Sequence, residues 1–266
     1  MKKILLSSLC VMCIMTGWAQ YKKETKSKKD EKREARRDKI NLLMKQEEEG
    51  ELVFNKHHIF GFKMISDGYG LSYEFGKYKS NRKTTLFQFE FNEKRHPKEK
   101  KISLFDGFGF SNVVFGKTNN FYQAKLGIAQ QLRVGGKANK NGVAVSAIVG
   151  GGLSAGLLKP YYVKVVDQNN VNEEFQSTFP TIIDSVYGIN GAAGIFTGWG
   201  EVKFNPGAHA KAAMRFDYGR FNENVTAIEV GLMAEYYSKD VSQLAYVKQK
   251  QFFFSGYISI LLGRRK

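Results

Sequence analysis

The residues that could do chemistry in this chain are few, and its four histidines come first. His57 and His58 are neighbours in an alternating stretch, so they point to opposite faces of a strand and cannot readily share one metal ion. We interpret them as a surface or interfacial pair. His96 lies beside Pro97 in a polar loop, where we expect it to be exposed to solvent.

His209 is the histidine with the most polar company. It shares a predicted strand face with Lys211, Arg215 and Asp217, and a histidine near an acid and a serine can build a hydrolytic triad. No serine stands in a nucleophile motif, however, and the serines of the last predicted strand only face the same interior. We therefore expect no enzymatic activity, with a lipid-directed outer-membrane hydrolase kept as an alternative.

Other catalytic and binding chemistry finds little support. Both cysteines, Cys10 and Cys13, lie in an N-terminal segment that we expect to be removed, so the mature chain has no disulfide, thiol nucleophile or cysteine-ligated metal. The glycines at 150–152 and Gly156 are not followed by Lys-Ser/Thr or by a helical pattern, which excludes a phosphate-binding loop. We predict no cofactor and no metal site.

The elements that must position these residues are strands. In residues 69–76 and 87–92, aromatic and aliphatic side chains alternate with glycine and polar ones, and the same period of two recurs to the C-terminus. Several runs are ten to fourteen residues long by the printed sequence, longer than the usual strand of about 5–6 residues. The predicted strands are 57–65, 69–78, 84–92, 104–116, 121–134, 143–155, 160–167, 206–218, 225–238 and 251–262.

The strand count depends on the segment LLKP at 157–160. We expect about ten strands, within a range of 8–12. If LLKP is only a kink in one long strand, eight becomes the expected number. Asp67-Gly68 is a two-residue turn signal, and the other connections are short except for one long loop near 167–205, which we expect to face outward.

Alternation alone fits two architectures. A soluble barrel or sandwich buries its apolar face, whereas a membrane barrel turns that face to lipid and its polar face to the lumen. Strand length, tyrosines near strand ends and the exported start of the chain favour a closed antiparallel transmembrane β-barrel, an all-β fold. In the last strand, Phe252, Phe254, Ile258, Ile260 and Leu262 would face lipid, and Phe253, Ser255, Tyr257 and Ser259 the lumen.

Three segments are predicted. Residues 1–19 have a basic start, an apolar stretch and small residues at the end, as a secretory signal peptide does. Residues 20–50 form a basic, partly helical or disordered periplasmic tail, which we interpret as a spacer or as the contact to a periplasmic envelope partner. Residues 51–266 form the barrel. The net charge of +16 would suit nucleic acid, but export argues against that partner.

The lumen face of the predicted strands carries charges of both signs. Because the interior of a barrel with about 8–10 strands is filled by side chains, these charges should pair in a polar network. A narrow passive pore for small polar solutes is the alternative. The predicted network consists of Lys63, Glu74, Glu90, Lys125, Arg133, His209, Lys211, Arg215, Asp217, Glu229 and Glu235.

Several stretches resemble a family of outer-membrane β-barrel proteins of Bacteroidota. They are FNEKRHPKEKK (91–101), VFGKTNNFYQAKLGIAQQ (114–131), GGGLSAGLLKPYYV (150–163) and the closing ISILLGRRK. The resemblance covers about residues 65–266 and implies location and fold, without catalytic residues to carry over. We expect a structural or accessory role in the cell envelope, at the outer membrane, with outer-membrane lipid and lipopolysaccharide as partners.

Overall fold

The computed structural model describes residues 28–48, 54–105, 110–137, 142–167, 170–179, 187–194, 196–219 and 223–266. The predicted signal peptide, residues 1–19, lies outside the described residues and stays a prediction. Contacts divide the chain into two units, residues 1–45 and 46–266. Among the residues described, no helix has both the length and the apolar character needed to cross a membrane.

The helix α2, Lys28–Glu48, carries the charges of the predicted tail. Asp30 and Glu31 lie in its first turn and Lys45 in its last, the arrangement that suits the helix dipole. The Arg33 guanidinium lies 3.7 Å from the Asp30 carboxylate one turn away. The described side chains of α2 are mostly exposed, so its stability comes from helix propensity and local charge pairs.

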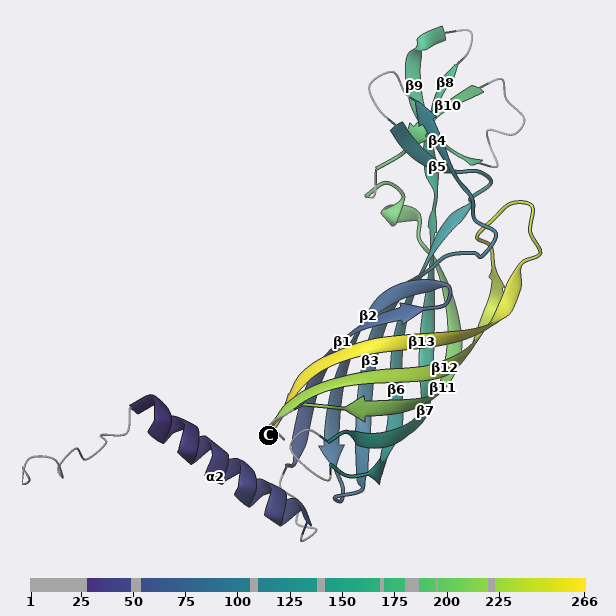
Figure 1. Cartoon of the computed structure of the whole chain (residues 1–266). Coiled ribbons are helices and arrows are strands. Elements are labelled where there is room, and N and C mark those ends of the chain that lie inside the picture. The colour runs from purple at the N-terminus through teal and green to yellow at the C-terminus, as the bar shows by residue number, and fades with distance from the viewer. Residues whose placement is uncertain are drawn as a thin grey trace, which may run out of the picture. The chain divides into compact units, whose positions relative to one another are not determined.

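Eight long strands of the second unit form a closed antiparallel barrel (Figure 1). Around the barrel the order is β1-β13-β12-β11-β7-β6-β3-β2. Each barrel strand therefore lies beside the next barrel strand in the chain, and the last strand, β13, lies beside the first, β1. The barrel strands are β1 Lys56–Ile65, β2 Gly68–Tyr78, β3 Lys83–Lys94, β6 Asn119–Gly135, β7 Ala144–Pro160, β11 Lys203–Asp217, β12 Asn224–Val241 and β13 Lys250–Arg265.

The first and last strands close the barrel. β1 pairs with β13 from His57↔Arg265 to Ile65↔Tyr257. The barrel therefore has one end where β1 begins and β13 stops, called here the terminal end. At the opposite end β1 turns into β2 through Ser66 and Asp67, one residue before the turn that the sequence predicted, and Gly68 begins β2.

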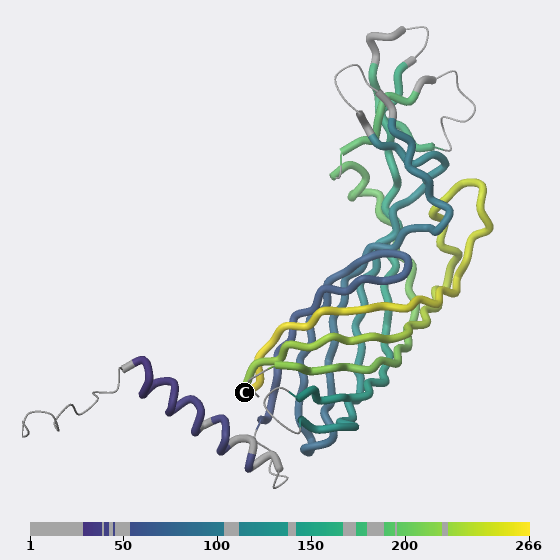
Figure 2. Tube along the Cα trace, in the orientation of Figure 1, coloured from purple at the N-terminus to yellow at the C-terminus, as the bar shows by residue number. Residues whose placement is uncertain are grey.

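The remaining strands form a second layer beyond that opposite end, called here the head (Figure 2). The head consists of a hairpin, a three-stranded sheet in the order β10-β8-β9, and a short 3₁₀ helix. Val113, Val163 and Val165 are its buried apolar contacts. Its elements are β4 Lys101–Phe105, β5 Phe110–Val114, β8 Tyr162–Asp167, β9 Asn170–Thr178, β10 Tyr187–Ala192 and η1 Trp199–Glu201.

The prediction of about ten strands is wrong for the barrel, which has eight. LLKP lies within β7, which runs to Pro160 without a break. The predicted strands 104–116 and 160–167 correspond to the head, because residues around them pair locally as β4 with β5 and β8 with β9. The long loop expected at 167–205 contains two head strands and the start of β11.

Candidate functional site: the charged interior of the barrel

Side chains alternate between the two faces of the barrel wall. Along β1 every second residue is buried and its neighbours are exposed. The exposed positions are large and apolar, such as Phe60, Leu126 and Phe254, while the buried ones include charges. In the last strand the side chains predicted to face outward are all at least half exposed: Phe252, Phe254, Ile258, Ile260 and Leu262. Of those predicted to face the lumen, Ser255, Tyr257 and Ser259 are buried.

Five cations and five carboxylates of the described interior are buried, and Arg265 and Lys137 add less deeply buried cations at the terminal end. The five buried cations are Lys63, Lys94, Lys125, Lys211 and Arg215, and the carboxylates are Glu74, Glu90, Asp217, Glu229 and Glu235. A charge removed from water without a partner is costly. Pairing of the two signs is therefore the first condition for this interior to be stable.

Arg215 is the centre of the network. It binds Glu74 through two bonds, from Nη1 to Oε1 at 2.8 Å and from Nη2 to Oε2 at 2.7 Å. It also donates from Nε and Nη2 to Oε2 of Glu229, at 3.0 and 2.7 Å. The hydroxyl of Tyr257 donates to the other Glu229 oxygen at 2.7 Å. This planar, forked recognition of carboxylates is a property of arginine that lysine lacks.

Two further groups of charges occupy the interior between the Arg215 group and the head end of the barrel. Glu90 lies 2.6 Å from Lys63 Nζ and 3.1 Å from Lys211 Nζ. Glu235 pairs with Lys125 and lies 2.9 Å from Lys94 Nζ. These cations come from β1, β3, β6 and β11 and their acids from β3 and β12, so the pairs tie the wall together across the lumen.

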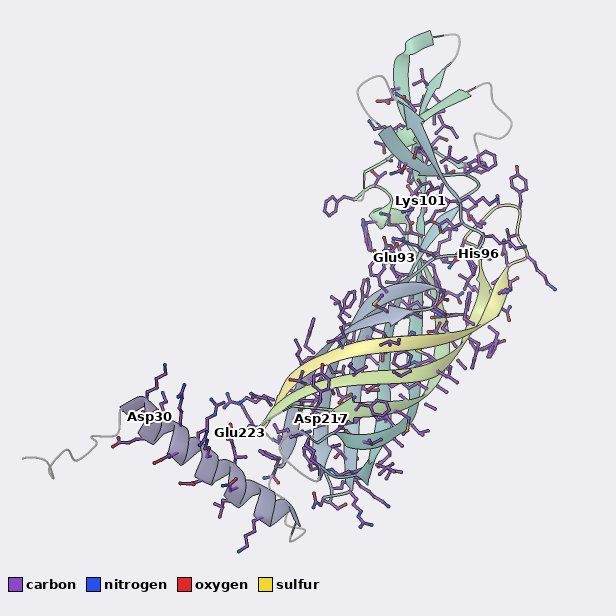
Figure 3. The ribbon with its side chains drawn as sticks, viewed as in Figure 1. Asp30, Glu93, His96, Lys101, Asp217 and Glu223 are labelled. Atoms are coloured by element: carbon purple, nitrogen blue, oxygen red, sulfur yellow. The ribbon has the colours of Figure 1, made fainter. Side chains whose placement is uncertain are left out.

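The terminal end of the interior is closed by a fourth group. Asp217 pairs with Arg265, and Lys137 Nζ lies 3.3 Å from its carboxylate. Arg265 Nε also donates to the Tyr78 hydroxyl at 3.0 Å. Arg133, predicted in the same network, is half-buried here, with Nη1 3.4 Å from Asn81 Oδ1. Figure 3 shows Asp217 near this end of the barrel.

The structure thus places the predicted lumen residues on the interior side of the wall. It also adds residues that the sequence reasoning left out. Lys94 was missed because the predicted strand ended at residue 92, although the alternation continues to Lys94. His57 is not a surface residue: it is buried, and its Nε2 lies 2.9 Å from the Glu74 carboxylate, whereas His58 on the opposite face is exposed.

His209 meets a serine inside the barrel. Its Nδ1 lies 3.0 Å from Ser154 Oγ, and both residues are buried. Among the described residues no hydrogen bond or ion pair joins His209 to a carboxylate, and no group of three or more His, Cys, Asp or Glu could hold a metal ion. Within the described part of the chain, the pair therefore has two members of a triad without the third.

Apolar contacts close the interior toward the head. Phe121, Tyr237 and Val241 pack together with Leu158, and the Phe121 and Tyr237 rings meet edge to face with centroids 5.3 Å apart. Beyond them, the backbone of residues 116–119 hydrogen-bonds to the backbone of residues 242–245. These two segments together are called here the strap. Gly116 O accepts from Ala245 N at 2.8 Å, and Gln243 O accepts from Thr118 N at 2.9 Å.

The strap links two sides of the head-end opening, because two strands, β7 and β11, lie between β6 and β12 around the barrel. Within the charged interior, two cavities have volumes of about 20 and 10 Å³, and each has room for at most about one water molecule. Among the described residues, side chains fill the interior, as expected for eight strands.

The fold and its interior define a class: a closed eight-stranded barrel with an apolar outside and a charged, paired inside. Three solved structures are similar to the chain. Neisserial surface protein A is 10% identical (TM-score 0.39, covering 80% of this chain and 97% of that one). The N-terminal barrel domain of Pseudomonas aeruginosa OprF is 11% identical (TM-score 0.36, 79% and 98%). Ail, the attachment invasion locus protein of Yersinia pestis, is 11% identical (TM-score 0.37, 80% and 100%).

No protein-family model matches the sequence, and the search of the curated proteins gives no significant match.

Proposed function

We propose that this chain is a non-enzymatic outer-membrane β-barrel that holds the head at the cell surface and does not conduct. The observation that carries the proposal is the reversed distribution of side chains, apolar outside and charged inside. A water-soluble barrel would expose its charges and bury its aromatic residues. Lipid is the solvent in which this outer surface is stable.

The orientation follows from the two ends of the barrel. The terminal end has short connections, and the opposite end carries the head and the strap. In barrels of outer membranes the short turns face the periplasm and the long connections face outward. The head therefore faces the exterior, and α2 belongs to the periplasmic side, where the basic tail remains a candidate contact for an envelope partner. The resemblance to barrels of Bacteroidota supports the same location.

The filled interior favours a structural role over the narrow pore. Opening a path for solutes would require separating ion pairs such as Arg215–Glu74 and breaking the strap. We expect the purified chain in planar bilayers to show no steady conductance steps. Reproducible steps from the folded, heat-modifiable protein would contradict this part of the proposal and favour the pore.

Location and orientation are tested by cysteine labelling in whole cells. Both natural cysteines lie in the predicted signal peptide, so a single introduced cysteine is the only thiol of the mature protein. Phe196, which is 87% exposed at the head side, and Ser80, in the exposed β2–β3 turn at the terminal end, form a matched pair. We expect a membrane-impermeant maleimide to label Phe196→Cys in intact cells and Ser80→Cys only after permeabilisation. Labelling of Ser80→Cys alone in intact cells would reverse the orientation.

A further inference from the structure

A pocket of about 390 Å³ lies where the outer rim of the barrel meets the head. Its floor comes from the barrel, with Tyr69, Glu93 and Tyr122, and its upper wall from the head and its connections, with Lys101, Asn112 and Thr197. Figure 3 shows Glu93 and Lys101 at this junction. The volume falls in the range of about 300–1,000 Å³ that is typical of small-molecule sites.

The barrel side of the pocket continues the outward face of the wall. Tyr69, Glu93 and Tyr122 are register partners on β2, β3 and β6, and the Tyr69 hydroxyl donates to Glu93 at 2.6 Å. The Trp199 ring stacks on Tyr122 with centroids 5.5 Å apart. Tyrosine and tryptophan gather at the headgroup level of membranes. If the barrel spans the outer membrane as proposed above, the pocket opens at the headgroups of the outer leaflet.

The pocket is cationic. Four of its lining side chains are basic, Arg95, Lys101, Lys117 and Lys159, and two are acidic, Glu93 and Glu99. Each acid already faces a cation: Lys117 Nζ donates to Glu99 at 2.9 Å, and Arg95 Nε lies 3.6 Å from Glu93. With both carboxylates in such contacts and four cations present, the lining favours a ligand with negative charge.

The cations are interleaved with aromatic rings. Arg95 lies over the Tyr69 ring at 5.4 Å, Lys117 over Tyr161 at 5.5 Å, and Lys159 over Trp199 at 5.2 Å. Ring faces pack against the apolar face of a sugar, and Asn and Thr side chains hydrogen-bond its hydroxyls, while lysine and arginine bind phosphate. This combination suits a ligand that has both hydroxyls and phosphate.

We infer that this pocket binds a phosphorylated saccharide, of the kind that forms the headgroup of an outer-leaflet glycolipid. The chemistry of the ligand is inferred from the pocket lining alone. Its source, a lipid of the outer leaflet, rests on the proposed membrane orientation. Basic pockets at the membrane surface bind lipid headgroups by the same combination of charge and hydrogen bonding. Lys101 and Arg95, the exposed cations of the rim, are the residues we assign to the phosphate, and Arg95 exchanges its 3.6 Å contact with Glu93 for it.

The test is calorimetric titration of the full chain, purified in detergent without glycolipid. The probe is a glucosamine disaccharide carrying two phosphates and no acyl chains, and the same disaccharide without phosphates is its control. We expect the phosphorylated probe to bind at least tenfold more tightly. Equal affinity for the two probes, or no binding of either, would overturn the inference.

A double variant, Arg95→Gln with Lys101→Gln, should weaken binding of the phosphorylated probe at least tenfold. Both side chains are exposed, so heat-modifiable migration on a gel should be unchanged. Lys203→Gln is the matched control, because Lys203 is an exposed lysine at the head end of β11 outside this pocket, and it should leave binding as in the wild type. Equal losses in the control and double variants would contradict the assignment.

The source of the saccharide is distinguished in a second arm. The chain is placed in nanodiscs that contain either phosphatidylcholine alone or phosphatidylcholine with a bisphosphorylated glycolipid, and the lipid retained is measured by native mass spectrometry. Retention of the glycolipid by the wild type but not by the double variant assigns the membrane source. Binding of the soluble probe without retention of the glycolipid assigns a free saccharide. The proposed function fails separately, in the cysteine labelling described above.

Discussion

Arg215 shows how a single side chain organises the barrel interior. It is buried, and it is shared by Glu74 from β2 and Glu229 from β12. Both carboxylates are buried with the guanidinium, so the three residues form one unit. The loss of any member leaves an uncompensated charge, which is the expensive state for a buried ion pair.

We predict that Arg215→Met destabilises the barrel by about 3–5 kcal/mol, because Glu74 and Glu229 are left buried with fewer partners. The loss is measured as a lower midpoint in urea unfolding in detergent. A triple variant that adds Glu74→Gln and Glu229→Gln removes the uncompensated charges and should recover most of it. If the single and triple variants unfold at the same urea concentration, the network is not organised by charge pairing.

Sequence reasoning worked well at this scale for the side of the wall that each residue faces. The two-residue period of a strand has only two outcomes, so the predicted interior positions such as Lys63 and Glu229 follow from a single correct register. It failed for His57, although residues 57 and 63 share one face of the predicted strand 57–65, because two adjacent histidines at the start of a strand resemble a surface pair. It also could not tell which acid each cation would bind, since those pairs join strands far apart in the chain.

At the scale of elements, β7 is held close to its neighbours by glycine. A side chain on Gly152 would overlap the backbone of Leu126 on β6, and one on Gly151 would approach the His209 carbonyl oxygen of β11. The run of glycines at 150–152 is thus a place where three strands approach each other closely.

We predict that Gly152→Ala lowers barrel stability by about 1–3 kcal/mol, because the new methyl group forces the β6 and β7 backbones apart. The readout is the temperature at which the folded gel band disappears. Gly136→Ala is the control, since a Cβ there meets no atom within 4 Å, and it should melt with the wild type. A Gly152 variant as stable as the Gly136 variant would show that the strands are not in close contact.

The head is the part of the fold that the sequence did not predict, because its strands were assigned to the barrel. The stretches 104–116 and 160–167 alternate as barrel strands do, and alternation indicates that a strand has two different faces without indicating its neighbour. Strand pairing determines whether a segment belongs to the head or to the barrel. β8 pairs with β9 and β10 in the head, while β7 continues through LLKP and pairs with β11 as far as Lys203↔Leu158. Register of this kind is set by contacts between residues distant in sequence.

For the molecule as a whole, apolar residues on the outside of the barrel and charged residues on the inside favour lipid over water as the surrounding solvent. The alternation and strand length predicted a closed antiparallel barrel, and the structure confirms that fold with eight strands. Composition was a poor guide, since a net charge of +16 is typical of proteins that bind nucleic acid.

We predict that Leu126→Arg, at an outward position that is 64% exposed, costs about 2–4 kcal/mol when the protein folds in phospholipid vesicles. A charge on this face must leave water for the hydrocarbon layer. The measurement is equilibrium unfolding by guanidinium in vesicles, with Phe196→Arg on the exposed head side as the control, expected within about 0.5 kcal/mol of the wild type. An unchanged Leu126 variant would indicate that water, not lipid, surrounds the barrel.

The seam between β1 and β13 sets the order in which the molecule can form. The contacts that close the cylinder join residues about two hundred positions apart, such as Lys63↔Ser259, so they carry the largest entropy of loop closure in the chain. Until the last strand has been synthesised and delivered, β1 and β12 each present an unpaired edge. Completion of the cylinder is thus a late, slow event, and a nascent chain must be protected from edge-to-edge aggregation until its C-terminus arrives.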